Sequence, residues 1–300
     1  MRLSVVMPTY NRPDALPRAL DALARQTLDP SEFELVLVED PKNESPPDTG
    51  GRPFAIRTLR GTQPGASSAR NVGWRAAQAP VVLFMGDDII GSPNLLEQHV
   101  AWHARHPEDT AGVLGEVHWA RGLKRDAFMK WLDMGIQFDY ATIHGIEAGP
   151  GHFYTANVSL KRSMLERAGG FDEERFPFLY EDIDLGLRLF EHGFRLLYNE
   201  EATAEHLHQP TLEQWKGRME RIAQAERRWI DRYPDHQPYF HDLFVDAVRR
   251  PELRGRRGKL LMRVVPRSAP FLGESVWENA DLYFRQQLGK PFMEAWERGS

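Results

Sequence analysis

Short runs of apolar and β-branched residues alternate with stretches of helical spacing along the first part of this chain. Apolar residues recur three and four positions apart in the stretches between these runs, which is the spacing of helices that bury one face. This alternation predicts an α/β domain with a mostly parallel central sheet flanked by helices. The predicted strands are Leu3–Met7, Phe33–Val38, Phe54–Leu59 and Val81–Met85, and the predicted helices are Ala15–Leu23, Ala66–Ala79 and Leu95–His106.

Polar side chains follow three of these predicted strands. Tyr10 comes after the first strand, Asp40 after the second, and Asp87 and Asp88 after the fourth. Ligands of open α/β sheets bind outside the carboxyl ends of the strands. We therefore expect a ligand site at this edge of the sheet.

Asp87 and Asp88 stand between a buried strand and the apolar pair Ile89-Ile90. Charge in such a place is costly unless a cation or hydrogen-bond donors meet it. Hard carboxylate oxygens there suit Mg²⁺ or Mn²⁺ bridging a diphosphate. A turn with two solvated acids is the alternative interpretation.

Two further groups carry chemistry. Glu181 and Asp182 begin a predicted helix at 182–192, where acids either compensate the helix dipole or provide a general base that deprotonates a hydroxyl. His206 and His208 lie two apart in an extended stretch, so they point the same way. They could complete a carboxylate and imidazole metal site, or be ordinary structural histidines.

A series of landmarks runs in order over about residues 1–210. In chain order they are Val5 to Arg12, Gln26-Thr27, Phe33 to Asp40, Gly65 to Asn71, Phe84 to Ile89, Ala156-Asn157, Gly169 to Glu173, Glu181 to Leu185, and His206. The series resembles family 2 glycosyltransferases of the GT-A fold. The chain departs from the family pattern at Gly86, where an acid is usual, and at Glu39-Asp40, where two aspartates are common.

The resemblance implies a nucleotide site along the first half of the chain. It places Tyr10 against the nucleobase, gives Asp40 a hydrogen bond from the base, and puts Arg70 on the base or the diphosphate, with a helix-surface ion pair as the alternative for Arg70. The full set that it implies for nucleotide and donor is Pro8, Tyr10, Asn11, Asp40, Arg70 and Asp87.

The resemblance also implies catalytic and metal residues. Asp182 is the expected catalytic base, with Glu181 beside it near the acceptor. Asp88 is the expected ligand of a divalent cation, Mn²⁺ or Mg²⁺, with His206 as the favoured imidazole and His208 as its rival. The reaction implied is an inverting transfer from a nucleotide-diphosphate sugar to the hydroxyl of a glycan or glycolipid acceptor, as in polysaccharide biosynthesis.

The segment Gly149–Ser159 lies where the family shapes the donor-sugar and acceptor site. Its candidates are His152, Tyr154 and Asn157, and Trp119 before it could stack on a sugar ring. An ordinary place in the core is the alternative for the tryptophan. Two rival functions are a non-catalytic nucleotide-sugar-binding protein and a sugar-nucleotide pyrophosphorylase, although the latter should carry a glycine-rich loop after the first strand, where this chain has Pro8–Asn11.

The landmarks divide the chain into a GT-A domain at 1–210 and a helical C-terminal region at 211–300. Within the first, residues 1–115 form the expected nucleotide-binding half and residues 116–210 the acceptor and catalytic half. Thr211–Tyr233 has the spacing of one long charged amphipathic helix.

Composition and net charge limit which partners and which cellular location we expect for this chain. The net charge of −5 gives no basic field for nucleic acid, so no nucleic-acid partner is expected. Without cysteines the chain forms no disulfides, and no apolar run reaches the length of a membrane span. We expect a cytoplasmic protein. The segment 249–267 holds eight lysines and arginines and one acid, which predicts peripheral contact with the inner face of a membrane. A solvated surface or an oligomer contact is the alternative.

Overall fold

The computed structural model describes residues 1–44, 46–252 and 273–299. These residues form two compact units. The first comprises Met1–Leu123 and Phe138–His208. The second comprises Lys124–Gln137 together with the described residues from Gln209 onward. The predicted division into 1–210 and 211–300 places residues 124–137 in the first domain, whereas these residues belong to the second compact unit. They do so because α4 (Ala127–Leu132), within this segment, packs its apolar face inside the second unit.

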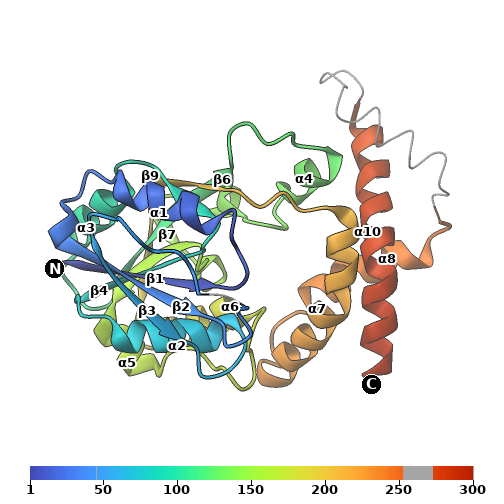
Figure 1. Ribbon diagram of the computed structural model, residues 1–300. Helices are drawn as coiled ribbons and strands as arrows, with labels where there is room; N and C mark the ends of the chain where they lie inside the picture. Colours follow the sequence, from blue (N-terminus) through green and yellow to red (C-terminus); the bar gives the residue numbers. More distant parts are fainter. Residues whose placement is uncertain (45, 253–272, 300) are drawn as a thin grey trace. The chain divides into compact units, whose positions relative to one another are not determined.

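In the described residues of the first unit, nine strands form one sheet (Figure 1). Its order is β3-β2-β1-β4-β8-β6-β9-β5, with β7 also paired to β9. The strands are β1 (Leu3–Thr9), β2 (Phe33–Glu39), β3 (Ala55–Arg60), β4 (Val81–Met85), β5 (Ile89–Gly91), β6 (Ala111–Trp119), β7 (Glu147–Ala148), β8 (Asn157–Lys161) and β9 (Arg195–His206).

The sheet is parallel from β3 through β2 and β1 to β4, as the strand and helix alternation predicts. β8 then runs antiparallel to both of its neighbours, β4 and β6. β5 and β7 are also antiparallel to β9, whereas β6 and β9 are parallel. The predicted α/β fold with helices on the sheet is confirmed, and its sheet is mixed beyond β4.

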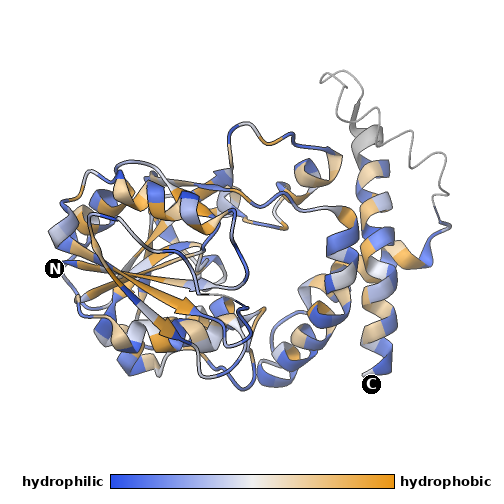
Figure 2. Ribbon diagram, in the orientation of Figure 1, coloured by the Kyte–Doolittle hydropathy of each residue, from blue (hydrophilic) through white to orange (hydrophobic). Residues whose placement is uncertain are grey.

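Helices cover both faces of this sheet (Figure 1). One face packs against α1 (Leu16–Ala24) and α3 (Leu95–Arg105) through a buried cluster that includes Val5 and Leu20. The other packs against α2 (Ala66–Ala76), α5 (Arg162–Ala168) and α6 (Glu181–Glu191) through a cluster that includes Val6. Alternate residues of β1 thus enter opposite cores, which is why the strand is largely apolar and does not alternate with polar residues (Figure 2).

A bulge interrupts the long strand β9. Gly115 of β6 lies opposite Asn199, but the next residue, Glu116, lies opposite Thr203. Residues 200–202 are therefore extra on the β9 side of the ladder. After the bulge, pairing continues to Trp119 and His206 at the carboxyl ends of the two strands.

The second unit is helical, as predicted for the C-terminal region. It contains α4, α7 (Leu212–Arg232), α8 (Tyr239–Arg249) and α10 (Gly273–Arg298). The buried carboxylate of Glu226 accepts the backbone N–H groups of Phe240 and His241 at 2.7 and 2.8 Å, where α8 begins. This caps donors that a helix start leaves unpaired.

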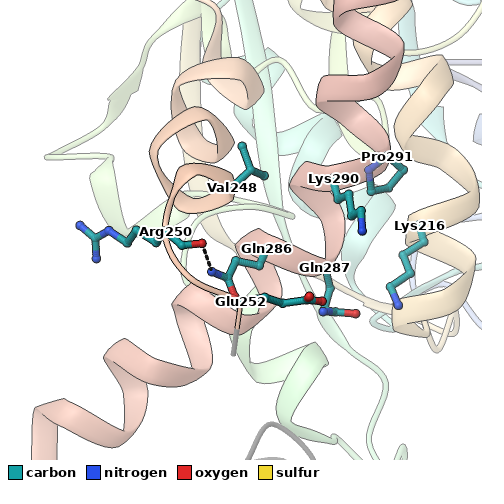
Figure 3. A pocket seen from close by; sticks show the side chains of 8 residues that line it. All are labelled: Lys216, Val248, Arg250, Glu252, Gln286, Gln287, Lys290 and Pro291. Carbon is teal, nitrogen blue, oxygen red and sulfur yellow. Dashed lines mark hydrogen bonds between the residues drawn. The ribbon is translucent and has the colours of Figure 1, made fainter. Parts of the chain in front are cut away.

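A cavity of about 440 Å³ lies within this helical unit (Figure 3). Gln286 forms part of its wall and donates through Nε2 to the carbonyls of Ala247, Arg250 and Pro251 at the end of α8. Residues 253–267 of the basic segment lie outside the described residues, so its membrane contact stays a prediction. Within the part of the chain that the structure describes, no helix has the length and apolar character needed to cross a membrane.

Candidate active site

The carboxyl ends of β1 and β4 bring Asp87 against the first strand. Thr9, the last residue of β1, donates its hydroxyl to Asp87 Oδ2 at 2.7 Å, and the Tyr10 backbone N–H also donates to this carboxylate. Burial and the neighbouring Asp88 nevertheless raise the pKa of Asp87 to about 6. The buried carboxylate is therefore held by β1, and it lies at the sheet edge where the sequence predicts a ligand.

Asp88 meets His206 because β5 pairs with β9. Ile89 lies opposite His206 in this ladder, and the Leu207 backbone N–H donates to the Asp88 carbonyl at 2.9 Å. The two side chains approach to 3.3 Å between Asp88 Oδ2 and His206 Nε2. Burial alone would raise the pKa of Asp88, but the contact with His206 and the charges of His206, Arg12 and His208 outweigh burial and lower it.

On its other side, His206 stacks on Trp119. The ring centroids lie 5.4 Å apart and the planes differ by 8°. Trp119 is opposite His206 in the β6–β9 ladder, so strand pairing fixes this contact. The side chain that was a candidate for stacking on sugar therefore orients the imidazole in this structure.

The donor set at Asp88 suits a divalent cation. Its oxygen faces the imidazole Nε2, and the other ring nitrogen, His206 Nδ1, is buried without a hydrogen-bond partner. The His208 ring centroid lies 5.8 Å from that of His206. Among the described residues, no three His, Asp or Glu side chains gather as one metal-binding group. One carboxylate and one imidazole still fit Mg²⁺ or Mn²⁺, since such ions take much of their coordination from water and substrate phosphates.

The second acidic pair, Glu181 and Asp182, forms the first turn of α6. Glu181 Oε1 accepts from Arg70 Nη1 at 2.9 Å, and both side chains are largely buried. Asp182 is half-buried, and its Oδ1 accepts the Ile183 backbone N–H at 3.0 Å. Burial, followed by the charge of Glu181, raises the pKa of Asp182 to about 7. A carboxylate with such a pKa is suited to accept a proton near neutral pH.

The backbone before α6 adopts a rarely populated conformation. Leu179 and Tyr180 have φ values of 66° and 65°, which non-glycine residues seldom adopt. Upstream, Ser67 at the start of α2 donates its backbone N–H to Pro177 and its hydroxyl to Phe176. A Cβ on Gly65 would lie 2.6 Å from the Pro177 carbonyl oxygen, so this close approach needs glycine. Packing against α2 thus fixes the segment that delivers the acidic pair.

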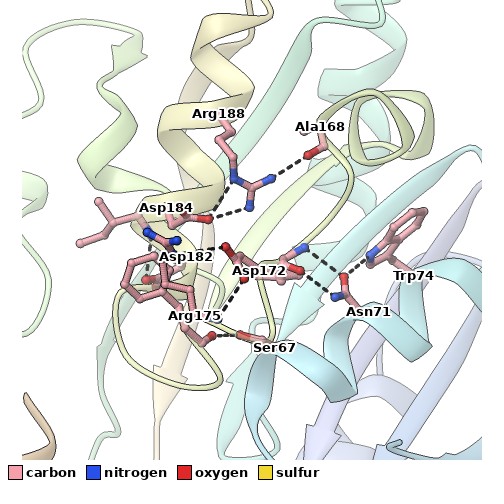
Figure 4. Close-up of polar contacts among 12 residues, drawn as sticks. Ser67, Asn71, Trp74, Ala168, Asp172, Arg175, Asp182, Asp184 and Arg188 are labelled. Carbon is pink, nitrogen blue, oxygen red and sulfur yellow. Dashed lines mark hydrogen bonds and ion pairs between the residues drawn. The ribbon is translucent and has the colours of Figure 1, made fainter. Parts of the chain in front are cut away.

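Further bonds hold α6 and the preceding loop in place (Figure 4). Arg188 donates to Asp184 Oδ2 at 2.9 and 2.7 Å and to the Ala168 carbonyl at 2.6 Å. Asn71 of α2 binds the backbone of Phe171 through both its amide nitrogen and its oxygen. Asp184 is therefore a structural anchor, whereas Asp182, two residues earlier, carries no side-chain counter-ion of its own in the described residues.

The predicted nucleotide residues line the same end of the sheet. Pro8 lies in β1, and Tyr10 exposes 51% of its surface beside it. Asn11, with φ of 48°, accepts the Glu44 backbone N–H, and Asp40 accepts those of Lys42 and Gly65. Arg70 contacts Glu181 rather than projecting free, so the ion pair that was its alternative interpretation is present.

The predicted acceptor residues serve the protein's own structure. Asn157 is fully buried, and its amide binds His99 Nε2 and the Ala202 carbonyl, so it is not open to a sugar. Tyr154 accepts the Asp139 backbone N–H through its hydroxyl. His152 Nε2 lies 3.0 Å from Thr142 Oγ1. Local sequence does not show that a polar strand residue such as Asn157 is buried, and the acceptor roles of these residues stay predictions.

Sequence reasoning gave no individual role to Thr9 or Arg12. Thr9 lies within the resembling motif, and its position two residues after the predicted strand Leu3–Met7 is the signal that could have identified it. Arg12 Nη2 lies 3.6 Å from Asp88 Oδ2 and its Nε lies 3.8 Å from Asp87 Oδ1. That approach depends on the path of the loop after β1 and has no local signal.

Comparison with known proteins places this arrangement in a family. Residues 4–166 match the profile of the glycosyl transferase family 2. The chain belongs to this family. It is 30% identical over 237 residues to validoxylamine A glucosyltransferase of Streptomyces hygroscopicus subsp. limoneus, an alignment that covers 67% of this chain and 50% of that protein. The chain thus spans about half the length of this relative.

Two solved structures share the fold of this chain. The Staphylococcus aureus TarS 1–349 complex with UDP-GlcNAc matches with a TM-score of 0.55 at 15% identity, covering 100% of this chain and 91% of that one. The mannosyltransferase PcManGT from Pyrobaculum calidifontis, in complex with GDP-Man and Mn²⁺, matches at 0.58 and 18% identity, covering 98% and 87%. The family 2 and GT-A fold predictions are therefore confirmed.

Proposed function

We propose that this family 2 protein is a glycosyltransferase that moves a sugar from a nucleotide-diphosphate donor to an acceptor hydroxyl, with inversion at the anomeric carbon. The observation that carries the proposal is the pairing of two unlike acidic sites in one unit. Asp88 faces an imidazole and suits a cation, while the pKa of Asp182 is raised to about 7 and suits a proton.

In this mechanism, Tyr10 stacks on the base, Asp40 accepts a hydrogen bond from it and Asp87 contacts the ribose. Asp88 and His206 would hold the divalent cation, Mn²⁺ or Mg²⁺, with His208 as the alternative imidazole. When bound, the cation neutralises charge that develops on the leaving diphosphate. The complex of a structural relative with GDP-Man and Mn²⁺ supports this choice of partners.

Asp182 removes the proton of the acceptor hydroxyl as that oxygen attacks the anomeric carbon. The bond to the donor diphosphate breaks on the opposite face, so a single displacement inverts the configuration. Glu181, held by Arg70, lies beside Asp182. Its charge favours the protonated form of Asp182, which helps this residue to take up the proton.

We infer a glycan or glycolipid acceptor from the family resemblance and from the name of one relative, an O-antigen biosynthesis protein of Myxococcus xanthus. The acceptor identity and a peripheral membrane location through 249–267 both belong to this proposal. A non-catalytic nucleotide-sugar-binding protein would keep Tyr10 and Asp40 but have no need for a carboxyl with a pKa near 7.

The deciding experiment is a thermal-shift screen of UDP, GDP, dTDP and CDP, each with and without Mn²⁺, followed by turnover of the matching sugar donor. We expect one nucleotide to raise the melting temperature only when Mn²⁺ is present. Asp88→Asn should lose this shift, whereas Glu191→Gln, an exposed change at the far end of α6, should keep it. If no nucleotide stabilises the wild-type chain under any condition, the donor site is wrong. If a nucleotide binds but its sugar is never transferred, the result supports the alternative of a non-catalytic nucleotide-sugar-binding protein.

A further inference from the structure

Arg12 faces the acidic pair from the loop after β1. Its Nη2 lies 3.6 Å from Asp88 Oδ2, and its Nε lies 3.8 Å from Asp87 Oδ1. The same Asp88 oxygen lies 3.3 Å from His206 Nε2. The guanidinium therefore spans both carboxylates at the place where a divalent cation would meet Asp88.

Arg12 lies near the two carboxylates as a counter-ion and forms no close, hydrogen-bonded ion pair with either. Both distances from Arg12 exceed normal hydrogen-bond lengths. Arg12 exposes 43% of its side chain, whereas Asp87 and Asp88 expose 11% and 13% of theirs. Ion pairs with such an exposed partner are weak, because water competes for the charge and the long side chain keeps its freedom.

The backbone of Arg12 is fixed although its side chain is not. Asn11 turns the chain with φ of 48°, and the Arg12 carbonyl accepts the Leu16 backbone N–H at the start of α1. The guanidinium can thus change partner while its Cα stays at the end of β1, beside Tyr10.

Two charges of the same sign compete for these carboxylates. A divalent cation at Asp88 and His206 would repel a guanidinium a few ångströms away. A donor diphosphate would at the same moment bring negative oxygens to this place, and guanidinium binds phosphate through two parallel hydrogen bonds. Both forces move Arg12 off the acids and onto the donor.

We propose that Arg12 is an exchangeable counter-cation: it neutralises Asp87 and Asp88 in the metal-free protein and transfers to the donor diphosphate when the divalent cation binds. This rests on the proposed function, because it needs a nucleoside diphosphate at the site. It assigns Arg12 to donor binding and makes it a competitor of the metal.

The test measures metal and nucleotide separately, without turnover, in Arg12→Gln. Titration of Mn²⁺ alone, followed by electron paramagnetic resonance, should show about 5-fold tighter binding than in the wild type, since a weak competing ion pair is removed. Calorimetry with UDP or GDP at saturating Mn²⁺ should show about 10-fold or more weaker binding, since a charged hydrogen-bond donor is lost. The two affinities thus change in opposite directions.

Arg18→Gln is the matched control, because it removes one exposed arginine from the nearby helix α1 and should change neither affinity. Arg12→Lys keeps the charge and should restore the wild-type affinity for Mn²⁺ more fully than that for the nucleotide. If Arg12→Gln weakens Mn²⁺ binding or leaves it unchanged, exchange is wrong and Arg12 only supports the acids. If the wild-type chain itself binds neither Mn²⁺ nor nucleotide, the proposed function fails together with this inference.

Discussion

The two acidic pairs of the first unit, Asp87-Asp88 and Glu181-Asp182, differ in the charged side chains that meet them. Asp88 is met by His206 and Arg12, and the pKa of this carboxyl is lowered despite its burial. Asp182 has Glu181 beside it, while Arg70 pairs with Glu181, and the pKa of Asp182 is raised to about 7. Asp88 and Asp182 are the same residue type, and their pKa values shift in opposite directions because their neighbours differ. The proposed function gives the first a cation and the second a proton.

The largest effect that this comparison predicts is on turnover. Asp182→Asn removes the proposed base while keeping its size, so kcat should fall by about 10²–10⁴-fold. Nucleotide binding with Mn²⁺ should stay at the wild-type level, because Asp182 belongs to the other pair. Steady-state kinetics and calorimetry on one protein preparation check both points. Full activity in this variant would remove Asp182 from the catalytic role.

Arg70 provides the next test, because its guanidinium forms the ion pair with Glu181 of the second acidic pair. Arg70→Gln leaves the Glu181 carboxylate buried without its partner, and breaking such a pair costs about 3–5 kcal/mol of the free energy of unfolding. Denaturant unfolding measures this loss, and Arg70→Gln with Glu181→Gln should recover much of it.

The same Arg70→Gln variant should also move the pH profile. Arg70 lowers the pKa of Asp182, so its removal raises that pKa further. The base is active only when deprotonated, and the acidic limb of kcat/KM should therefore shift to higher pH. If nucleotide affinity falls while the acidic limb stays in place, Arg70 serves the nucleotide as the family resemblance implies.

Thr9 tests how the first pair is held. Thr9→Val keeps the shape but removes the hydroxyl that donates to Asp87 Oδ2, leaving a buried carboxylate short of one donor. We expect a loss of about 1–3 kcal/mol in the free energy of unfolding. Thr9→Ser retains the hydroxyl and is the control. Equal stability of Thr9→Val and Thr9→Ser would show that this hydrogen bond contributes little.

The smallest effect concerns stability and pH at Asp182. A carboxyl with a raised folded-state pKa binds its proton more tightly when folded, so ionising it weakens the fold as pH rises from about 4 through about 7. Asp182→Asn cannot ionise and escapes this penalty. Its melting temperature should exceed that of the wild type by more at pH 8 than at pH 5, by an amount on the order of 2 °C. Differential scanning calorimetry at the two pH values decides this, and a constant difference would contradict the raised pKa.

Local patterns were sufficient for β1, β2 and β4, because each is short, largely apolar and buried on both faces. They also placed Asp87 and Asp88 at the correct edge, since the carboxyl ends of parallel strands meet there. β6 and β8 were not predicted. β6 contains Gly112 and Gly115, and β8 contains buried polar residues at Asn157 and Ser159, so neither follows a simple apolar rule.

Contacts across the sheet were beyond local patterns for a different reason. The meeting of Asp88 and His206 depends on pairing between β5 and β9, which are far apart in sequence. The burial of Asn157 depends on His99 of α3 and on the bulge at Ala202. Such information resides in pairs of distant residues. The family resemblance named Asp88 and His206 together, and it carried no sign that Asn157 is buried.

The bulge in β9 has a consequence for how this chain tolerates insertions and deletions. Side chains of a strand alternate between faces, so losing one residue from a regular ladder turns every later side chain over. Residues 200–202 have no counterpart in β6. Glu200 and Glu201 are exposed, so we expect a change of length there to leave the ladder on either side in register, whereas Ala202 is buried and its carbonyl accepts from Asn157. Every residue between Thr203 and His206 is paired with β6. Deletion of one residue there would therefore turn the imidazole of His206 away from Asp88. The bulge therefore separates changes in loop length from the end of the strand that carries His206.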